Sequence, residues 1–131
     1  DAKNGTVTVS KLLKKTVKTV TIPATVTIDG YTFKVTAVAN NVFKNASRLK
    51  SVVIGANVKS IGKSSFYKCK KLATITFKGI KAPGVGKNAF KSGKSKVTVK
   101  VPKKMKKSQL NKLKKALKKA GVKKASYKKT K

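Results

Sequence analysis

The sequence predicts a repeat solenoid, mostly β with short helical turns, with a β-hairpin near its N-terminus and a C-terminal amphipathic capping α-helix. The main observation is a segment that returns every 23 to 24 residues, at residues 38–54, 61–77 and 85–101. The three copies share an aromatic residue in the same place: Phe43, Phe66 and Phe90. A fixed period of this length is typical of stacked coils that bury their apolar side chains only against neighbouring coils.

Each copy is expected to open with one turn of α-helix or 3₁₀-helix that holds the aromatic residue, followed by a polar corner and a strand. Side chains alternate along a strand, so one set should point inward: Val52, Ile54, Ile75, Phe77, Val99 and Val101. The other set should form an outward lattice: Ser51, Val53, Thr74, Thr76, Thr98 and Lys100. The third copy is degenerate, because Lys96 stands where the other copies have leucine. A final coil commonly departs from the pattern since it faces a cap.

The segment before the repeats predicts strands and a hairpin. Residues 6–22 alternate weakly and contain lysines that discourage edge-to-edge pairing: Lys11, Lys14, Lys15 and Lys18. Residues 24–37 predict a hairpin around Asp29-Gly30, because both residue types tolerate positive φ between alternating apolar residues. We interpret Asp29 as a turn residue rather than as a functional acid.

Residues 108–120 predict a helix, with Ser108 as its N-cap and Gly121 just beyond its end. One stripe at helical spacing is apolar: Leu110, Leu113, Ala116, Leu117 and Ala120. A basic amphipathic helix can bind an anionic membrane surface, but its position at the end of the repeats favours a cap on the last coil. Residues 122–131 are expected to be extended or frayed.

These segments predict one structural domain in four parts. Residues 1–37 would form the N-terminal strands and hairpin cap, and 38–102 the three repeats. Residues 103–121 would form the capping helix, and 122–131 a basic tail. Because three repeats are few for a solenoid, we expect the chain to be a piece of a larger protein. It contains no apolar run long enough to span a membrane.

The charge of the chain is extreme. Its 131 residues include 35 Lys and Arg but only two Asp and Glu, a net charge of +33, and Arg48 is the one arginine. A lysine ammonium is a hydrated point charge without the planar fork of arginine. This composition therefore predicts diffuse, salt-dependent attraction to a polyanion: an acidic glycan, a cell-wall polymer or an acidic protein. Solubility or retention in a cell wall is the alternative reading of the same charge.

Several lysines fall in repeated positions or on the outer face of the helix, and stacked coils set such residues about 5 Å apart. The candidate anion-binding residues are Lys44, Lys63, Lys87, Lys91, Lys100, Lys115, Lys118 and Lys119. Nucleic acid is the rival partner for so basic a chain. Because the chain has one arginine and no repeated aromatic and basic interleaving, we expect only nonspecific nucleic-acid binding in vitro.

The composition argues against an enzyme. The chain has no histidine, and two carboxylates, one at the terminus and one in a turn, do not supply a general acid and base. No Cys and His cluster points to a metal, and no motif points to a cofactor. Cys69 has neighbouring lysines that would lower its pKa, but a small apolar filler of the coil is the better interpretation.

The unit Ile-Gly-x-x-x-Phe-x-x-Cys-x-x-Leu-x-x-Ile-x-Phe at residues 61–77 resembles the BspA-like leucine-rich repeat. The lead-in at 20–26 also resembles this repeat, and the lysine-rich ending with a Leu and Lys helix resembles the C-terminal end of such arrays. The resemblance implies an extracellular or bacterial cell-surface protein with a noncatalytic, adhesive or ligand-binding role. The alternative is a purely structural C-terminal cap of a larger repeat adhesin. As a fragment, the chain is expected to be monomeric.

The unbalanced charge leads to a prediction about stability. Self-repulsion weakens the compact state most at low salt, where the Debye length grows to about 30 Å. We expect the melting temperature to rise between about 10 and about 300 mM sodium chloride as screening shortens that length. Thermal unfolding followed by circular dichroism measures it. A melting temperature that stays flat or falls over this range would contradict the prediction.

Overall fold

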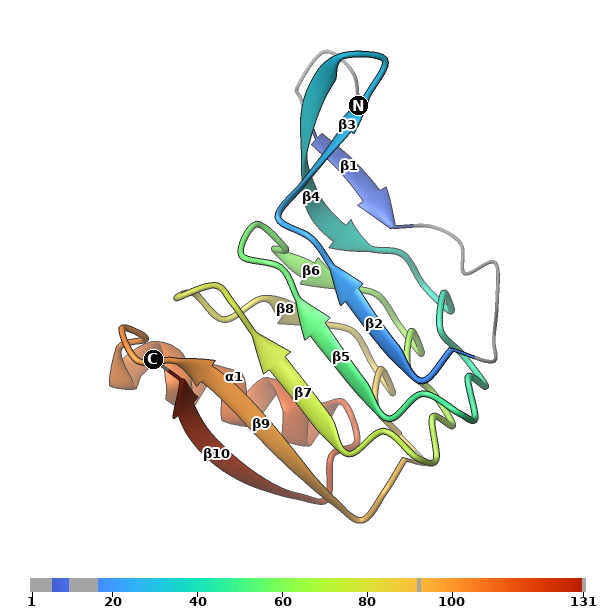
Figure 1. The fold of residues 1–131 in the computed structure, drawn as a ribbon. Helices are drawn as coiled ribbons and strands as arrows, with labels where there is room; N and C mark the ends of the chain where they lie inside the picture. The colour runs from blue at the N-terminus through green and yellow to red at the C-terminus, as the bar shows by residue number, and fades with distance from the viewer. Residues whose placement is uncertain (1–5, 10–16, 92, 131) are drawn as a thin grey trace.

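The chain winds into a short solenoid whose coils contribute strands to two sheets (Figure 1). The structure is a computed structural model that describes residues 6–9, 17–91 and 93–130. In Figure 1 the larger sheet faces the viewer, the smaller sheet lies behind it, and the helix closes the end nearest the C-terminus. The repeat solenoid predicted from the sequence is confirmed.

In the described part of the chain, the larger sheet is parallel and has the order β10-β9-β7-β5-β2; we name it sheet B. Its strands are β2 (Thr19–Ile22), β5 (Ser51–Ile54), β7 (Thr74–Phe77), β9 (Lys96–Pro102) and β10 (Lys124–Thr130). The smaller sheet, sheet A, has the order β1-β4-β6-β8, with β3 antiparallel to β4. Its strands are β1 (Thr6–Val9), β3 (Thr25–Ile28), β4 (Tyr31–Val38), β6 (Ser60–Ile61) and β8 (Gly84–Val85).

The core is built from side chains of successive coils in register. Val52 of β5 pairs with Ile75 of β7, which in turn pairs with Val99 of β9. The six residues expected to point inward are all buried. The ring centroids of Phe43 and Phe66 are 4.9 Å apart at an interplanar angle of 10°, and those of Phe66 and Phe90 are 5.0 Å apart at 3°. The aromatic residues of the repeat therefore form one continuous stack through the coils.

The segment around each phenylalanine is a chain of turns, not the turn of helix that we expected. Residues two before and two after the ring adopt left-handed backbone angles: φ is 66° at Asn41, 65° at Asn45, 54° at Ser64 and 61° at Lys68. Some N–H groups of these segments donate to the next coil, as Phe43 N does to Ser65 O at 2.7 Å, and others close local turns, as Lys44 N does to Asn41 O at 3.3 Å. A left-handed residue interrupts a right-handed helix, and the freed N–H groups bind the coils together.

In the second and third copies, a glycine after Ile61 or Val85 allows the coils to approach, and the first copy has Ala39 in this position. A Cβ atom on Gly62 would lie 2.6 Å from the backbone of Ala39 and Asn40. On Gly86 it would lie 2.6 Å from Lys63 N. Real Cβ atoms essentially never come this close, so any larger residue would push the coils apart. The glycine of the motif therefore has a packing role.

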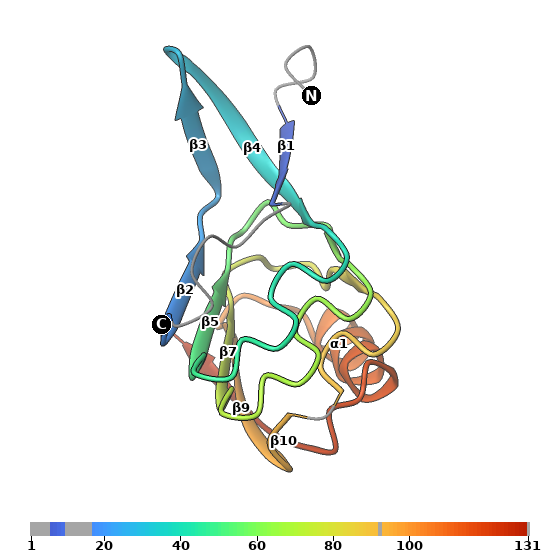
Figure 2. The ribbon, with the colours of Figure 1, turned by 90° about the vertical axis from the view of Figure 1, so that its right-hand side faces the viewer.

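The N-terminal segment continues the solenoid as a further coil. β2 pairs with β5 in register, with Val20 opposite Val52, and β1 pairs with β4 in parallel. Both are edge strands, as predicted, although Lys11, Lys14 and Lys15 lie outside the described residues. The hairpin is also as predicted, with φ of 51° at Asp29 and 81° at Gly30. Figure 2 shows that it projects beyond the coils.

The C-terminal end agrees with the predicted cap but differs in two details. Helix α1 (Lys107–Lys119) begins one residue earlier than expected, because Leu110 N donates to Lys106 O. Lys106 is therefore the N-cap, without a side-chain hydrogen bond, and Ser108 lies in the first turn. At the other end Val122 N donates to Leu117 O and Gly121 N to Lys118 O, with a φ of 108° at Gly121. This is the Schellman arrangement that a C-terminal glycine favours.

The tail is extended but not frayed. β10 pairs with β9 along its whole length, from Lys124 opposite Lys96 to Thr130 opposite Pro102. Leu113 and Leu117 of α1 and the C-cap residue Ala120 are fully buried. The helix and β10 together therefore cover the last coil on both of its sides.

The phenylalanine stack leads to a prediction. Phe66 stacks on two rings and Phe43 on one, and both are buried. Replacing each by leucine removes the ring but keeps an apolar side chain, and each lost ring pair contributes about 1 kcal/mol beyond burial. We expect Phe66→Leu to lower the free energy of unfolding by about 1 kcal/mol more than Phe43→Leu, which is the contribution of the second ring pair. Urea unfolding measures both, and equal losses would contradict the additive stack.

Candidate binding surfaces

Four of the eight predicted lysines lie in the segments that hold the phenylalanine stack. Lys63 and Lys87 are exposed and occupy the same position in successive coils, where Ser64 N donates to Lys87 O at 3.1 Å. Lys44 and Lys91 occupy another shared position, with Tyr67 between them. The Lys44 ammonium lies 5.6 Å from the centroid of the Tyr67 ring, an arrangement that favours a cation over the ring face. The structure thus brings these lysines into two rows along the coils.

The other four predicted lysines lie on different elements. Lys100 is exposed on the outer face of sheet B, next to Thr76 of β7 in register. Lys115, Lys118 and Lys119 lie on the exposed side of α1. The C-terminus of the helix lies next to the turn segment that carries Lys91, because Phe90 N donates to Ala120 O at 3.0 Å. The eight residues are therefore spread over three surfaces and do not converge on one site.

The lysine surface has almost no carboxylate to balance it. Asp1 lies outside the described residues, and Asp29, the other acid of the chain, lies in the exposed turn of the projecting hairpin (Figure 2). Charges separated by less than a Debye length of about 8 Å repel one another at physiological salt. The body of the solenoid consequently presents a positive field to any partner.

Sequence reasoning missed one cluster of cations. Four basic side chains line an open hollow of about 250 Å³ where β2, β5 and β7 begin: Lys18, Arg48, Lys50 and Lys71. A usable signal was present, because Arg48 and Lys71 each precede the buried leucine of the repeat and so share a position in successive coils. The pair is less evident than a repeated lysine, because the first copy has arginine and the third copy has Ser95 in this position.

A second groove follows the opposite corners of the coils. It has a volume of about 390 Å³ and lies between residues 56–59 and 80–83, beside the exposed side chain of Ile80. A smaller hollow of about 200 Å³ joins Ile80 to Lys104 and Lys106 near the start of α1. Gln109 holds this corner to the helix, since its Oε1 accepts a hydrogen bond from Ala82 N at 3.0 Å.

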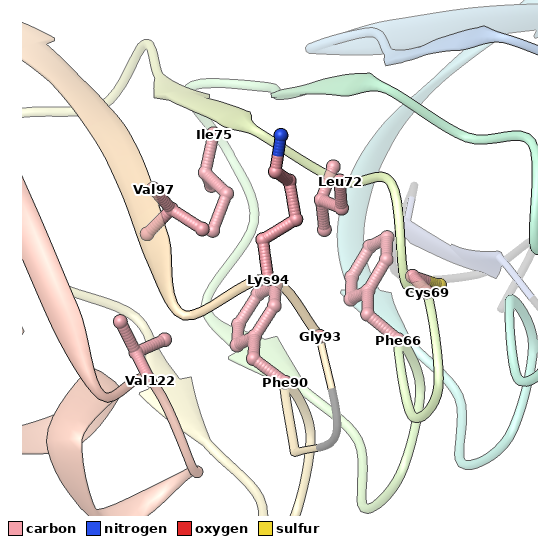
Figure 3. A pocket seen from close by; sticks show the side chains of 9 residues that line it. All are labelled: Phe66, Cys69, Leu72, Ile75, Phe90, Gly93, Lys94, Val97 and Val122. Atoms are coloured by element: carbon pink, nitrogen blue, oxygen red, sulfur yellow. The ribbon is translucent and has the colours of Figure 1, made fainter.

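Between the second and third coils, the described part of the chain leaves no room for a ligand. The cavity between the second and third coils has a volume of about 10 Å³, which is at the limit for one water molecule. Figure 3 shows Phe66 and Phe90 side by side at this cavity, with the Lys94 side chain extended past Phe90 toward Leu72 and Ile75. The aliphatic stem of a lysine commonly covers apolar surface in this way. Recognition by this part of the chain must therefore take place on the outer surface.

Cys69 is a packing residue. Its side chain is fully buried, and its Sγ donates a hydrogen bond to Phe43 O at 3.2 Å. Burial raises the pKa of the Cys69 thiol to about 11, and a hydrogen bond from the backbone of Ala46 opposes this only in part. The thiolate is the reactive form, so the structure favours the interpretation of Cys69 as a filler of the coil.

Neither a metal cluster nor a membrane helix is found in the described residues. No three His, Cys, Asp or Glu side chains of residues 6–9, 17–91 and 93–130 lie together in a group that could hold a metal ion. In the same ranges, no helix has the length and apolar character needed to cross a membrane.

Comparison with known families and structures gives consistent results. The family model of the BspA type Leucine rich repeat region matches residues 36–120. No curated protein gives a significant match. The crystal structure of a leucine rich cell surface protein from Faecalibacterium prausnitzii is similar, with a TM-score of 0.60 and 26% sequence identity over 76% of this chain and 33% of that one. A leucine-rich repeat protein from Bacteroides ovatus gives a TM-score of 0.47 at 22% identity, over 63% of this chain and 29% of that one. The chain thus spans about a third of the length of these structures.

The buried thiol leads to a prediction about pH. Because the pKa of Cys69 is raised to about 11 in the fold, against about 8.5 in an unfolded chain, the folded state holds the proton more tightly. This contribution to stability is complete below the unfolded pKa and is lost as pH rises toward the folded one. We expect the free energy of unfolding of the wild type, minus that of Cys69→Ala, to shrink as the pH rises from about 8 to about 10. The subtraction cancels the titration of the lysines, which both proteins share. Urea unfolding at each pH measures the difference, and a constant value would contradict the prediction.

Proposed function

Because the chain belongs to the BspA-type leucine-rich repeat family, we propose that it is a noncatalytic binding module of a bacterial cell-surface or secreted protein. Its preferred partners are anionic: a wall polymer, an acidic glycan or an acidic protein. The solved relative from Faecalibacterium prausnitzii is described as a cell surface protein, which supports the same location for this chain. Repeat solenoids commonly bind through their extended surfaces, and the filled interior of this one leaves the surface as the place of contact.

The observation that carries the proposal is the imbalance of charge, 35 basic residues against two acidic ones. The coils hold many of these cations on fixed backbone, in rows and in one hollow, so an approaching polyanion meets several of them together. A solvated charged face would ordinarily contain both signs. The cost of self-repulsion is offset when an anionic partner binds, and this links the composition to a function.

A purely structural role is the second candidate, and the C-terminal end of the chain favours it. Helix α1 and β10 cover the last coil, and the chain spans about a third of the solved relative. A terminal cap with a polar outer face is required for the solubility of repeat proteins. In this case other repeats of a longer protein would recognise the ligand, and the lysines would serve only solubility or retention in the wall.

Nucleic acid is a weaker candidate. In the rows described above, the ring that accompanies the lysines is that of Tyr67 alone, rather than a series on which successive bases could stack. The same lysines attract any polyanion, so binding of nucleic acid in vitro would be nonspecific and would fall steeply with salt.

Elution from two columns tests the proposal. The chain is applied to immobilised heparin and to a sulfopropyl cation exchanger, and both are developed with the same sodium chloride gradient. A preference for anionic glycan predicts elution from heparin at a distinctly higher salt concentration, because the glycan presents its charges in a spaced, three-dimensional array. A lysine-rich protein of similar net charge and unrelated fold is the control for bulk charge.

Elution of the chain from both columns at the same salt concentration would contradict the proposed preference. The structural candidate predicts that result, because a cap needs only a polar, charged exterior. A gradient on immobilised double-stranded DNA completes the comparison, and a later elution from DNA than from heparin would favour the nucleic-acid candidate.

A further inference from the structure

Four basic residues converge on one open hollow with a volume of about 250 Å³: Lys18, Arg48, Lys50 and Lys71. The backbone fixes two of its members in adjacent coils. Lys18 O accepts hydrogen bonds from Lys50 N at 2.7 Å and from Ser51 N at 3.3 Å. Lys50 O in turn accepts from Ala73 N at 2.8 Å. The coil that contains β2 and the coil that contains β5 therefore place Lys18 and Lys50 side by side.

The other two members come from the repeat itself. Arg48 and Lys71 each precede a buried leucine, Leu49 or Leu72, which anchors the turn to the core. The third copy has Ser95 in the corresponding position and Val97 where the first has Lys50. The cluster is thus confined to one corner of the solenoid. A uniform coating of charge would repeat in every coil, and this cluster does not.

The composition of the hollow indicates the chemistry of its ligand. Arg48 is the one arginine of the chain, and its guanidinium presents a planar fork that matches two oxygens of a phosphate or sulfate group. The three lysines supply point charges around it. Cations that face one another across an open hollow repel, and a doubly or multiply charged tetrahedral anion would relieve that repulsion.

We propose that Lys18, Arg48, Lys50 and Lys71 form a binding site for a sulfate or phosphate ester group carried on an anionic polymer. This inference rests on the proposed function and names the place at which the polymer is held most tightly. The two rows of lysines on the turn segments attract the polymer diffusely, and the hollow supplies the directional contact. None of the eight lysines singled out from the sequence belongs to this site.

A pair of charge-matched variants tests the site. The first is Arg48→Gln with Lys71→Gln; the second is Lys63→Gln with Lys87→Gln, an exposed pair that also occupies one position in successive coils. Both variants lose two positive charges. Isothermal titration with a heparin octasaccharide, at about 150 mM salt to screen diffuse attraction, gives the affinity. We expect the hollow variant to lose about tenfold or more and the control variant only about two- to threefold, because charge-assisted bidentate contacts are lost only in the first.

Three further arms identify the ligand group and the role of the fork. Titration with a short-chain polyphosphate separates phosphate from sulfate. The hollow prefers the group, phosphate or sulfate, whose ligand loses more affinity in the hollow variant. Hyaluronan, whose only charges are carboxylates, should not distinguish the two variants. Arg48→Lys keeps the charge but removes the fork, and it should weaken ester binding about threefold or more. Circular dichroism and melting temperature confirm that each variant folds, which exposed positions allow.

Equal losses in the hollow and control variants would overturn the site and leave the proposed anionic preference intact, because the binding would then follow total charge. Retention of full affinity by Arg48→Lys would overturn the role of the fork. Failure of the wild type to prefer heparin over the cation exchanger is a separate result that contradicts the proposed function itself.

Discussion

The structure depends on the stacking of side chains from one coil on those of the next. A single coil of 23 to 24 residues has an apolar row but nothing to cover it, so its burial requires neighbours on both sides. The rings of Phe43, Phe66 and Phe90 stack at centroid distances of 4.9 and 5.0 Å, close to the ~4.8 Å spacing of strands in a sheet. Ring spacing and strand spacing therefore agree, and the same repeat satisfies the backbone and the core. The same requirement explains the ends, where β1 and β2 cover one side and α1 with β10 cover the other.

This stacking also determines where the charge lies. Every exposed position of a coil has a counterpart on the next coil about 5 Å away, so a lysine that recurs in the repeat produces a row of like charges. Such a row opposes the stacking, and the core must offset its repulsion. The chain retains the lysines nonetheless, and the interior holds a cavity of only about 10 Å³. Under the proposed function, recognition and stability would act on opposite faces of the same coil, because apolar side chains inside hold together a set of cations outside.

The sequence was sufficient for the parts that repeat and insufficient for the parts that do not. Local patterns with one favoured conformation were enough for four features: the period, the inward residues of β5, β7 and β9, the Asp29-Gly30 hairpin and the helix end at Gly121. The turns around each phenylalanine were mistaken for helix because their spacing resembles one turn, although asparagine at positions 41, 45 and 88 indicates left-handed backbone. β10 was missed because its lysine-rich segment has little apolar alternation, and its pairing with β9 depends on tertiary contact. The basic hollow joins residues from three coils, and only the register of the sheet brings Lys18 beside Lys50.

The hollow and the lysine rows would bind an anion in different ways. Binding at the hollow would depend on how its cations are arranged, and binding at the rows would depend on how many cations are present. A flexible lysine on an open face can follow a polyanion in many arrangements, so each contact is weak and screened by salt. In the proposed site at the hollow, the register of neighbouring coils brings four basic residues together, and the guanidinium of Arg48 would add direction. Binding that depends on arrangement survives screening better than binding that depends on total charge, because short-range hydrogen bonds are screened little. A protein with this charge would adhere to many polyanions at low salt, and only a site of fixed geometry could select among them at the salt concentration of its surroundings.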